Sequence, residues 1–145
     1  MKLGELLEER ARLIAEIEGL LRLRSRTFVE QADSPSEVRF EDITKEIEQK
    51  RKELRKLKIK LIKANLSTRV PEASDVSNLM ELNLKITDII SEIDSLKRLS
   101  CADCYGEDKP QLSPRGLKER IFRLVREKVR LDVMRKTINW TTEVE

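Results

Sequence analysis

The sequence predicts an all-α fold in which four main helices form two antiparallel, coiled-coil-like hairpins related by an internal repeat. Four segments carry apolar residues at steps of three and four, and proline-containing breaks separate them. Charged side chains make up 39% of the 145 residues and aromatic side chains only 3%, so Leu and Ile must supply the packing. We expect a single helical domain over 1–145, with repeat halves 1–73 and 74–145.

The first helix is predicted from Leu3 to about Phe28, where charged residues separate the apolar ones. The string Ser-Pro-Ser-Glu that begins at Ser34 offers a cap, a first-turn proline and a third-position glutamate for the second helix. A start at residues 41–42 is the alternative. The second helix has heptad spacing with Lys50 in one seam position. Its predicted stripe is Phe40, Ile43, Ile47, Leu54, Leu57 and Leu61.

The third helix follows a connection that begins at Asn65 and has no helical pattern. A cap at Ser74 or Asp75 is expected to start this helix, which fades near Ser100. Asn83 is a polar intrusion into its apolar stripe. The residues predicted to be buried are Leu79, Ile86, Ile90, Ile93 and Leu96.

The fourth helix is predicted from about Arg115 to Thr137. Ser113 supplies its cap and Pro114 its first residue, where proline is favoured. Its predicted stripe is wider than those of the other helices. It comprises Leu117, Ile121, Leu124, Val125, Leu131 and Ile138, widened by Phe122, Val129, Val133 and Met134.

The two halves of the chain match each other when one is slid along the other. Sliding the second helix onto the fourth pairs Ile47 with Ile121, and sliding the first onto the third pairs Leu6 with Leu79. The endings match best, with Asn-Leu-Ser-Thr-Arg-Val from Asn65 and Asn-Trp-Thr-Thr-Glu-Val from Asn139. Each half is therefore predicted to form a helical hairpin whose second helix ends in this phrase.

The repeated phrase has two interpretations. The simpler one is a helix stop used twice, because asparagine tolerates the left-handed conformation that ends many helices and hydroxyls can bond the freed carbonyls. The alternative is a ligand pocket or subunit contact made by two polar clusters, with Trp140 as an interface anchor. The residues concerned are Asn65, Ser67, Thr68, Asn139, Trp140, Thr141 and Thr142.

Three strings occur in an order typical of a known family: Met1-Lys-Leu-Gly-Glu-Leu-Leu-Glu-Glu-Arg, Asn65-Leu-Ser-Thr, and Leu131-Asp followed by Asn139-Trp-Thr-Thr. They resemble the septicolysin-like family of small all-helical proteins of unknown function. The third helix departs from the pattern, because members usually carry Arg-Arg-Asp where this chain has Glu81-Leu-Asn-Leu. The resemblance implies long coiled-coil hairpins and assembly into homo-oligomers, hexamers among them. The family name suggests a membrane-active role.

Enzymatic chemistry has few candidates in this sequence. The chain contains no histidine, which removes the most common general base and the imidazole metal ligand. Its four glycines are isolated, so no glycine-rich phosphate loop is visible. Carboxylates are interspersed with Lys and Arg at helical spacing, where solvated ion pairs are the default. We therefore expect a protein that is not an enzyme and that uses no cofactor.

The pair Cys101 and Cys104 has the spacing of half a zinc site or of a redox-active dithiol. A structural zinc ion takes four ligands, so a complete site would need Asp103, Asp108 or a second subunit. The simpler interpretation is a dithiol that can oxidise without functional consequence, so no metal site is predicted. The pair is also absent from the pattern of the septicolysin-like family.

A run of cations near the end of the second helix could bind an anionic partner. This basic strip consists of Arg55, Lys56, Lys58, Lys60 and Lys63. Nucleic acid or another anionic surface is one possible partner. A solvated face, or a salt-bridge partner for acidic faces of another subunit, is the simpler interpretation, because the net charge is only +3 and aromatic residues are scarce.

The expected location is the cytoplasm, because the chain begins with charged residues, has no apolar run of 18 and contains only two cysteines. The expected function is that of a structural or interaction protein that assembles with itself, since long heptad helices expose Leu and Ile unless a partner covers them. Nucleic-acid or anionic-surface binding is the first alternative. A membrane role, suggested only by the family name, is the second, and the sequence identifies no small-molecule ligand.

Overall fold

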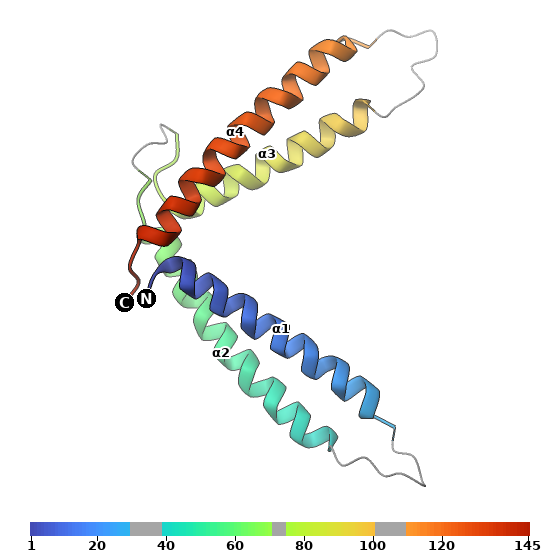
Figure 1. The fold of residues 1–145 in the computed structure, drawn as a ribbon, viewed down its shortest axis with the longest axis vertical. Coiled ribbons are helices and arrows are strands. Elements are labelled where there is room, and N and C mark those ends of the chain that lie inside the picture. The colour runs from blue at the N-terminus through green and yellow to red at the C-terminus, as the bar shows by residue number, and fades with distance from the viewer. Residues whose placement is uncertain (30–38, 71–74, 101–109) are drawn as a thin grey trace. The chain divides into compact units, whose positions relative to one another are not determined.

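The computed structural model describes residues 1–29, 39–70, 75–100 and 110–145. Its helices are α1 (Leu3–Thr27), α2 (Phe40–Ser67), α3 (Leu79–Ser100) and α4 (Pro114–Thr141), shown in Figure 1. The predicted all-α fold with four main helices is therefore confirmed. The Ser-Pro-Ser-Glu string at Ser34 lies outside the described residues, and α2 begins one residue before the alternative start at 41–42.

The chain forms two compact units. The first unit comprises Met1–Ala64 together with Trp140–Glu145, and the second comprises Asn65–Asn139. Their boundaries lie within α2 and α4, at the two asparagines that open the repeated phrase. The single domain and the repeat halves at 1–73 and 74–145 stay predictions.

In the first unit, α1 and α2 form an antiparallel hairpin (Figure 1). Contacts between them run in opposite order along the two helices: Glu16 meets Lys50, Arg24 meets Thr44, and Phe28 meets Phe40. An apolar cluster of Ile17, Ile43 and Ile47 fills the space between the helices, with Leu20, Leu21, Leu23 and Leu54 packed around it. The heptad seam predicted for the second helix thus supplies much of this core.

In the second unit, α3 and α4 lie side by side as the other hairpin, and α3 supplies most of the core (Figure 1). The prediction for Ile90 was wrong, because its side chain is 40% exposed while Ile89 is buried. Neighbouring residues on a helix point about 100° apart, and the buried positions follow steps of three and four from Leu82. The buried residues of α3 are Leu79, Leu82, Ile86, Ile89, Ile93 and Leu96.

The apolar residues of α4 divide between two opposite faces. Leu117 and Leu131 are buried, as predicted. Phe122, Val129 and Val133, which were predicted to widen the buried stripe, are 62%, 55% and 59% exposed. At about 100° per residue these three share one face, and it lies opposite Leu131. The outward face of α4 is therefore partly apolar.

The starts of α3 and α4 are held by side-chain caps. The prediction of Ser113 as the cap of α4 is confirmed, because its Oγ accepts a hydrogen bond from the Gly116 amide at 3.0 Å. The cap predicted for α3 was wrong: Asn78 Oδ1 accepts from the Glu81 amide at 2.9 Å. Asp75 instead pairs with Lys85 at 2.8 Å, and Ser74 lies outside the described residues.

Candidate functional site

The repeated phrase does not end its helices as predicted. Asn65 lies within α2 and Asn139 within α4, and the helices continue to Ser67 and Thr141. The predicted left-handed stop at asparagine was therefore wrong, and so was the end of α4 at Thr137. The physical reason is that main-chain hydrogen bonds just beyond each helix direct the chain away from the helical path.

These hydrogen bonds form two small antiparallel bridges. After α2, the Thr68 carbonyl accepts from the Leu79 amide at 2.9 Å, and the Val70 amide donates to the Ser77 carbonyl at 3.2 Å. The phrase after α2 is thereby tied to the start of α3. One bridge thus joins the end of one helix to the beginning of the next along the chain.

The second bridge joins the end of the chain to its beginning. The Thr142 carbonyl accepts from the Leu3 amide at 3.0 Å, and the Val144 amide donates to the Met1 carbonyl at 2.9 Å. The phrase after α4 is thereby tied to the start of α1. This bridge therefore repeats the hydrogen bonds of the first with partners that lie far apart in the sequence.

The two bridges use equivalent residues of the repeated phrase. Thr68 accepts in the first bridge and Thr142 in the second, and these threonines are paired when the two phrases are aligned at their asparagines. The donors Leu3 and Leu79 therefore correspond to each other. The apolar pattern had instead paired Leu6 with Leu79, so the hydrogen bonds give a different alignment of α1 with α3.

We call the segment of residues 140–145 with its partners at Met1–Leu3 the terminal clasp. Glu143 lies at its charged end, 3.1 Å from the Met1 ammonium group and 2.7 Å from Lys2 Nζ. Hydrogen bonds from Lys2 and then from the amino terminus lower the pKa of Glu143 below its ordinary 4.5. The clasp therefore combines main-chain pairing with an ion pair.

Trp140 packs against α1 within the same unit. A Cβ atom added to Gly4 would lie 2.7 Å from carbons of the Trp140 ring, so only glycine permits this approach. The Trp140 side chain nevertheless remains 49% exposed. Sequence reasoning missed the role of Gly4, since an isolated glycine in a helix gives no sign of what packs on it. The interface role of Trp140 stays a prediction.

The two polar clusters are divided between the two compact units. The first cluster, Asn65, Ser67 and Thr68, belongs to the second unit. The other cluster is split, with Asn139 in the second unit and Trp140, Thr141 and Thr142 in the first. Within the two clusters, the main-chain carbonyls of Thr68 and Thr142 take part in the bridges. A shared ligand pocket made by both clusters stays a prediction.

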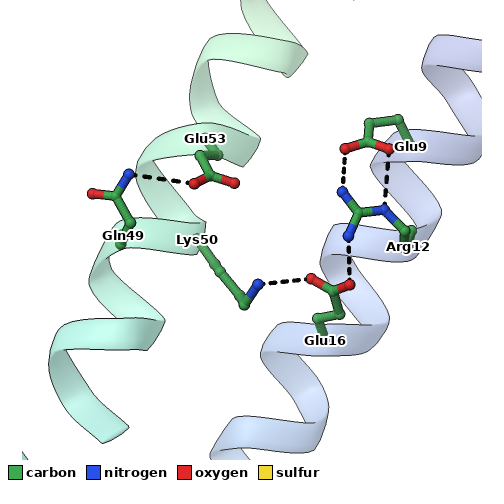
Figure 2. Close-up of polar contacts among 6 residues, drawn as sticks. All are labelled: Glu9, Arg12, Glu16, Gln49, Lys50 and Glu53. Atoms are coloured by element: carbon green, nitrogen blue, oxygen red, sulfur yellow. Dashed lines mark hydrogen bonds and ion pairs between the residues drawn. The ribbon is translucent and has the colours of Figure 1, made fainter. Parts of the chain in front are cut away.

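A polar chain crosses the α1–α2 seam (Figure 2). Arg12 binds both Glu9 and Glu16 on α1, and Lys50 Nζ on α2 lies 2.8 Å from Glu16 Oε2. The hydrogen bond from Lys50, followed by that from Arg12, lowers the pKa of Glu16, and Glu16 raises the pKa of Lys50. Beside it on α2, Gln49 Nε2 donates to Glu53 Oε1 at 3.3 Å. The seam lysine predicted from the heptad pattern thus has an acidic partner.

The basic strip lies on α2, where Arg55, Lys56, Lys58 and Lys63 are exposed and Lys60 is half-buried. Within the described ranges, none of the five forms an ion pair with an acidic side chain. Beside it runs a shallow groove of about 370 Å³ between α1 and α2. Its residues are Ile14, Ile17, Glu18, Arg51, Leu54, Arg55 and Lys58. The strip can attract anions, and nucleic-acid binding by it stays a prediction.

Cys101 and Cys104 lie outside the described residues, so their state stays a prediction. In the part of the chain that the structure does describe, no three acidic or cysteine side chains converge as metal ligands. Over the same residues, no helix combines the length and the apolarity needed to cross a membrane.

Comparison with known proteins identifies a protein with a similar fold but gives no function. The chain is similar over its whole length to a crystal structure of a functionally unknown conserved protein from Corynebacterium diphtheriae. The TM-score is 0.84 and the identity 20%, over 100% of this chain and 99% of that chain. No protein-family model and no curated protein matches the sequence. At this identity the likeness shows a shared all-α fold alone, and the septicolysin-like resemblance stays a prediction.

Proposed function

We propose that this protein is a non-enzymatic structural or interaction protein that assembles with copies of itself through the outward faces of α2 and α4. The observation that carries the proposal is exposed apolar surface on both helices. Ile59 and Ile62 on α2 are 48% and 49% exposed, and Val129 and Val133 on α4 are 55% and 59% exposed. We call these four residues the outward stripes.

One position of the outward stripes recurs in the two helices. Ile59 is paired with Val133 by the same alignment that pairs the accepting threonines of the two bridges, Thr68 and Thr142. A β-branched apolar residue thus recurs at the same exposed position, opposite the side that packs on the partner helix. Exposed apolar residues that gather on one face mark protein–protein contact surfaces, and a second copy of the chain is the simplest cover.

Charge complementarity also supports self-association. In the stretch Glu5–Glu18, α1 carries five acidic and two basic side chains, whereas the stretch 55–63 of α2 carries five basic and no acidic side chains. An acidic α1 of one copy can therefore face a basic strip of another at the rim of an apolar contact. Rim charges of this kind contribute mainly to orientation and association rate.

A non-enzymatic role agrees with the distribution of polar groups. The chain has no histidine. Among the described residues no polar or charged side chain is buried, so none lies where low polarity would tune it for catalysis. The resemblance to the septicolysin-like family belongs to the same proposal, because it implies homo-oligomers of long hairpins.

The proposal is tested by light scattering of the purified chain at several concentrations and at low and high salt. We expect a closed oligomer whose mass is constant over concentration. The double variant Ile59→Glu, Val133→Glu should reduce the mass to that of smaller species, because it places charge in the contact. Leu84→Glu is the matched control, since Leu84 on α3 is 58% exposed and lies outside the outward stripes. A monomeric native chain would contradict the proposal.

A further inference from the structure

The first halves of α2 and α4 differ in charge although their last residues form equivalent bridges. From Pro114 to Arg126, α4 carries five basic side chains and one acidic side chain. The equivalent stretch of α2, Phe40–Lys52, carries four of each. A hairpin therefore forms without an excess of cations, because α2 has none over this stretch. The excess on α4 needs another explanation.

An exposed aromatic ring lies in the middle of these cations. Phe122 is 62% exposed, and the Arg126 guanidinium lies 5.8 Å from the centre of its ring. Glu48 stands at the corresponding position of α2 when the two repeated phrases are aligned. The ring is thus a feature of α4 alone. We call Arg115, Lys118, Phe122, Arg123 and Arg126 the α4 basic face.

Two hollows adjoin the α4 basic face and share Arg115 and Lys118. One, of about 580 Å³, has Phe122 and Arg123 on its wall. The other, of about 510 Å³, is lined mainly by apolar residues, which lie between Pro110 and Ile121. Both hollows offer more room than a single phosphate group needs, and both combine cations with apolar surface.

The cations of this face are available to an anionic partner. Within the described residues, Lys118 and Arg123 form no ion pair with an acidic side chain. Arg115 meets Glu119 at 3.4 Å, but the two side chains are 90% and 62% exposed. Exposed pairs of this kind contribute little to stability, so a phosphate group can displace the carboxylate readily.

We propose that the α4 basic face binds single-stranded nucleic acid, with phosphates on its cations and a base stacked on Phe122. Arginine predominates on the face, and its planar fork matches phosphate oxygens. Exposed aromatic rings in a cationic setting are the usual platform for unpaired bases. A helix lying on a lipid surface needs a continuous apolar face, whereas Lys118 and Arg126 flank Phe122 one turn before and one turn after it.

The test is fluorescence anisotropy of a labelled oligothymidylate titrated with the full chain over a range of salt concentrations. Phe122→Ala should weaken binding by about 5- to 150-fold, the range for loss of one stacked base, with an unchanged salt dependence. The triple variant Arg115→Ala, Lys118→Ala, Arg123→Ala should lower the slope of log affinity against log salt by about 2.

The matched control removes the same charge from the basic strip of α2. The variant Arg55→Ala, Lys58→Ala, Lys63→Ala should keep the native affinity within about threefold, since these residues belong to the other unit and take no part in the proposed binding face, so that only diffuse attraction is lost. Equal losses in the two triple variants would overturn the proposal in favour of unspecific charge attraction.

Two further measurements distinguish nucleic acid from a lipid surface as the ligand, and nucleic-acid binding from self-assembly. Binding to phosphatidylglycerol vesicles without binding to the oligonucleotide would overturn the proposal in favour of a lipid surface. Phe122→Ala should retain the helical circular dichroism and the solution mass of the native chain, because the ring is exposed and precedes Val129, the first α4 residue of the outward stripes, by about two helical turns. Loss of oligonucleotide binding at unchanged mass therefore separates this site from self-assembly.

Discussion

The two hairpins resemble each other at the ends of α2 and α4 and differ in how these helices are held. Four residues of α2 are buried, whereas in α4 only Leu117 and Leu131 are. In the second unit α3 supplies most of the core instead. A hairpin can therefore bury its apolar surface mainly through one helix. The other helix then keeps more of its surface for partners.

The seams of the two hairpins also differ. Lys50 reaches Glu16 across the first hairpin, while the corresponding residue of α4 is Leu124, which is half-buried. An apolar seam gains stability from burial, and a charged pair in a seam favours one register. The first hairpin thus gives up some burial for a defined alignment of its helices.

The largest expected effect tests whether the two units unfold separately. Leu82 is 0% exposed in the second unit, so Leu82→Ala should cost about 2–5 kcal/mol there. Trp140, the only tryptophan, belongs to the first unit. We expect the urea midpoint measured by circular dichroism to fall more than the midpoint measured by Trp140 fluorescence. Equal shifts of the two midpoints would support the single domain. Leu6→Ala is the matched variant in the first unit.

The next effect concerns the contact between the Trp140 ring and Gly4 in the first unit. Gly4→Ala should destabilise the terminal clasp by about 1–3 kcal/mol, because the new methyl group overlaps the Trp140 ring. A red shift of Trp140 emission would report the displaced ring. Gly19→Ala is the control, since its nearest neighbour would be 3.9 Å away at the end of Arg22, and it should stabilise α1 by about 0.5–1 kcal/mol. Equal behaviour of the two variants would contradict the packing of Trp140 on Gly4.

A smaller effect is expected at the start of α4, the helix with the smaller core contribution. Ser113→Ala removes the acceptor for the Gly116 amide and should cost about 1 kcal/mol, whereas Ser113→Gly should cost a few tenths. Chemical denaturation of both variants checks the difference. Unchanged stability in Ser113→Ala would show that the hydroxyl contributes no cap.

The smallest effect is the pH dependence of the terminal clasp. The pKa of Glu143 is lower in the folded chain than its ordinary 4.5, so its contribution is present above pH 4.5 and is lost as the pH falls through the folded value. The contribution is small because the pair is exposed. Acid titration of the Trp140 emission should show the change, and Glu143→Gln should remove this part of it. An unchanged titration in that variant would assign the effect to another carboxylate.

The local features of the fold could be predicted from the sequence. The four helices follow from apolar periodicity, and the cap at Ser113 follows from a serine placed directly before a proline. The cap at Asn78 also had a signal, since an asparagine followed three residues later by Glu81 is a capping pattern. Ser74 and Asp75 are also residue types that cap helices, so residue type alone does not distinguish them from Asn78.

The relation between α1 and α3 could not be read from apolar spacing. A shift of about one helical turn places one apolar residue on another, so Leu79 can be paired with Leu3 or with Leu6 almost equally well. The hydrogen bonds at Leu3 and Leu79 decide between these alignments. For the same reason the sequence could not predict the partner of Lys50 or the packing of Trp140. Both depend on how separate segments of the chain align.

The two bridges make the same hydrogen bonds across very different lengths of chain. Thr68 and Leu79 are near neighbours in the sequence, whereas Leu3 and Thr142 stand close to its opposite ends. In the unfolded chain, closing the longer loop costs about 2 kcal/mol more entropy. We therefore expect the bridge between α2 and α3 to form early during refolding and the terminal clasp last. In stopped-flow refolding, Trp140 emission would then reach its native value after the helical signal, and covalent joining of the two ends should remove the delay.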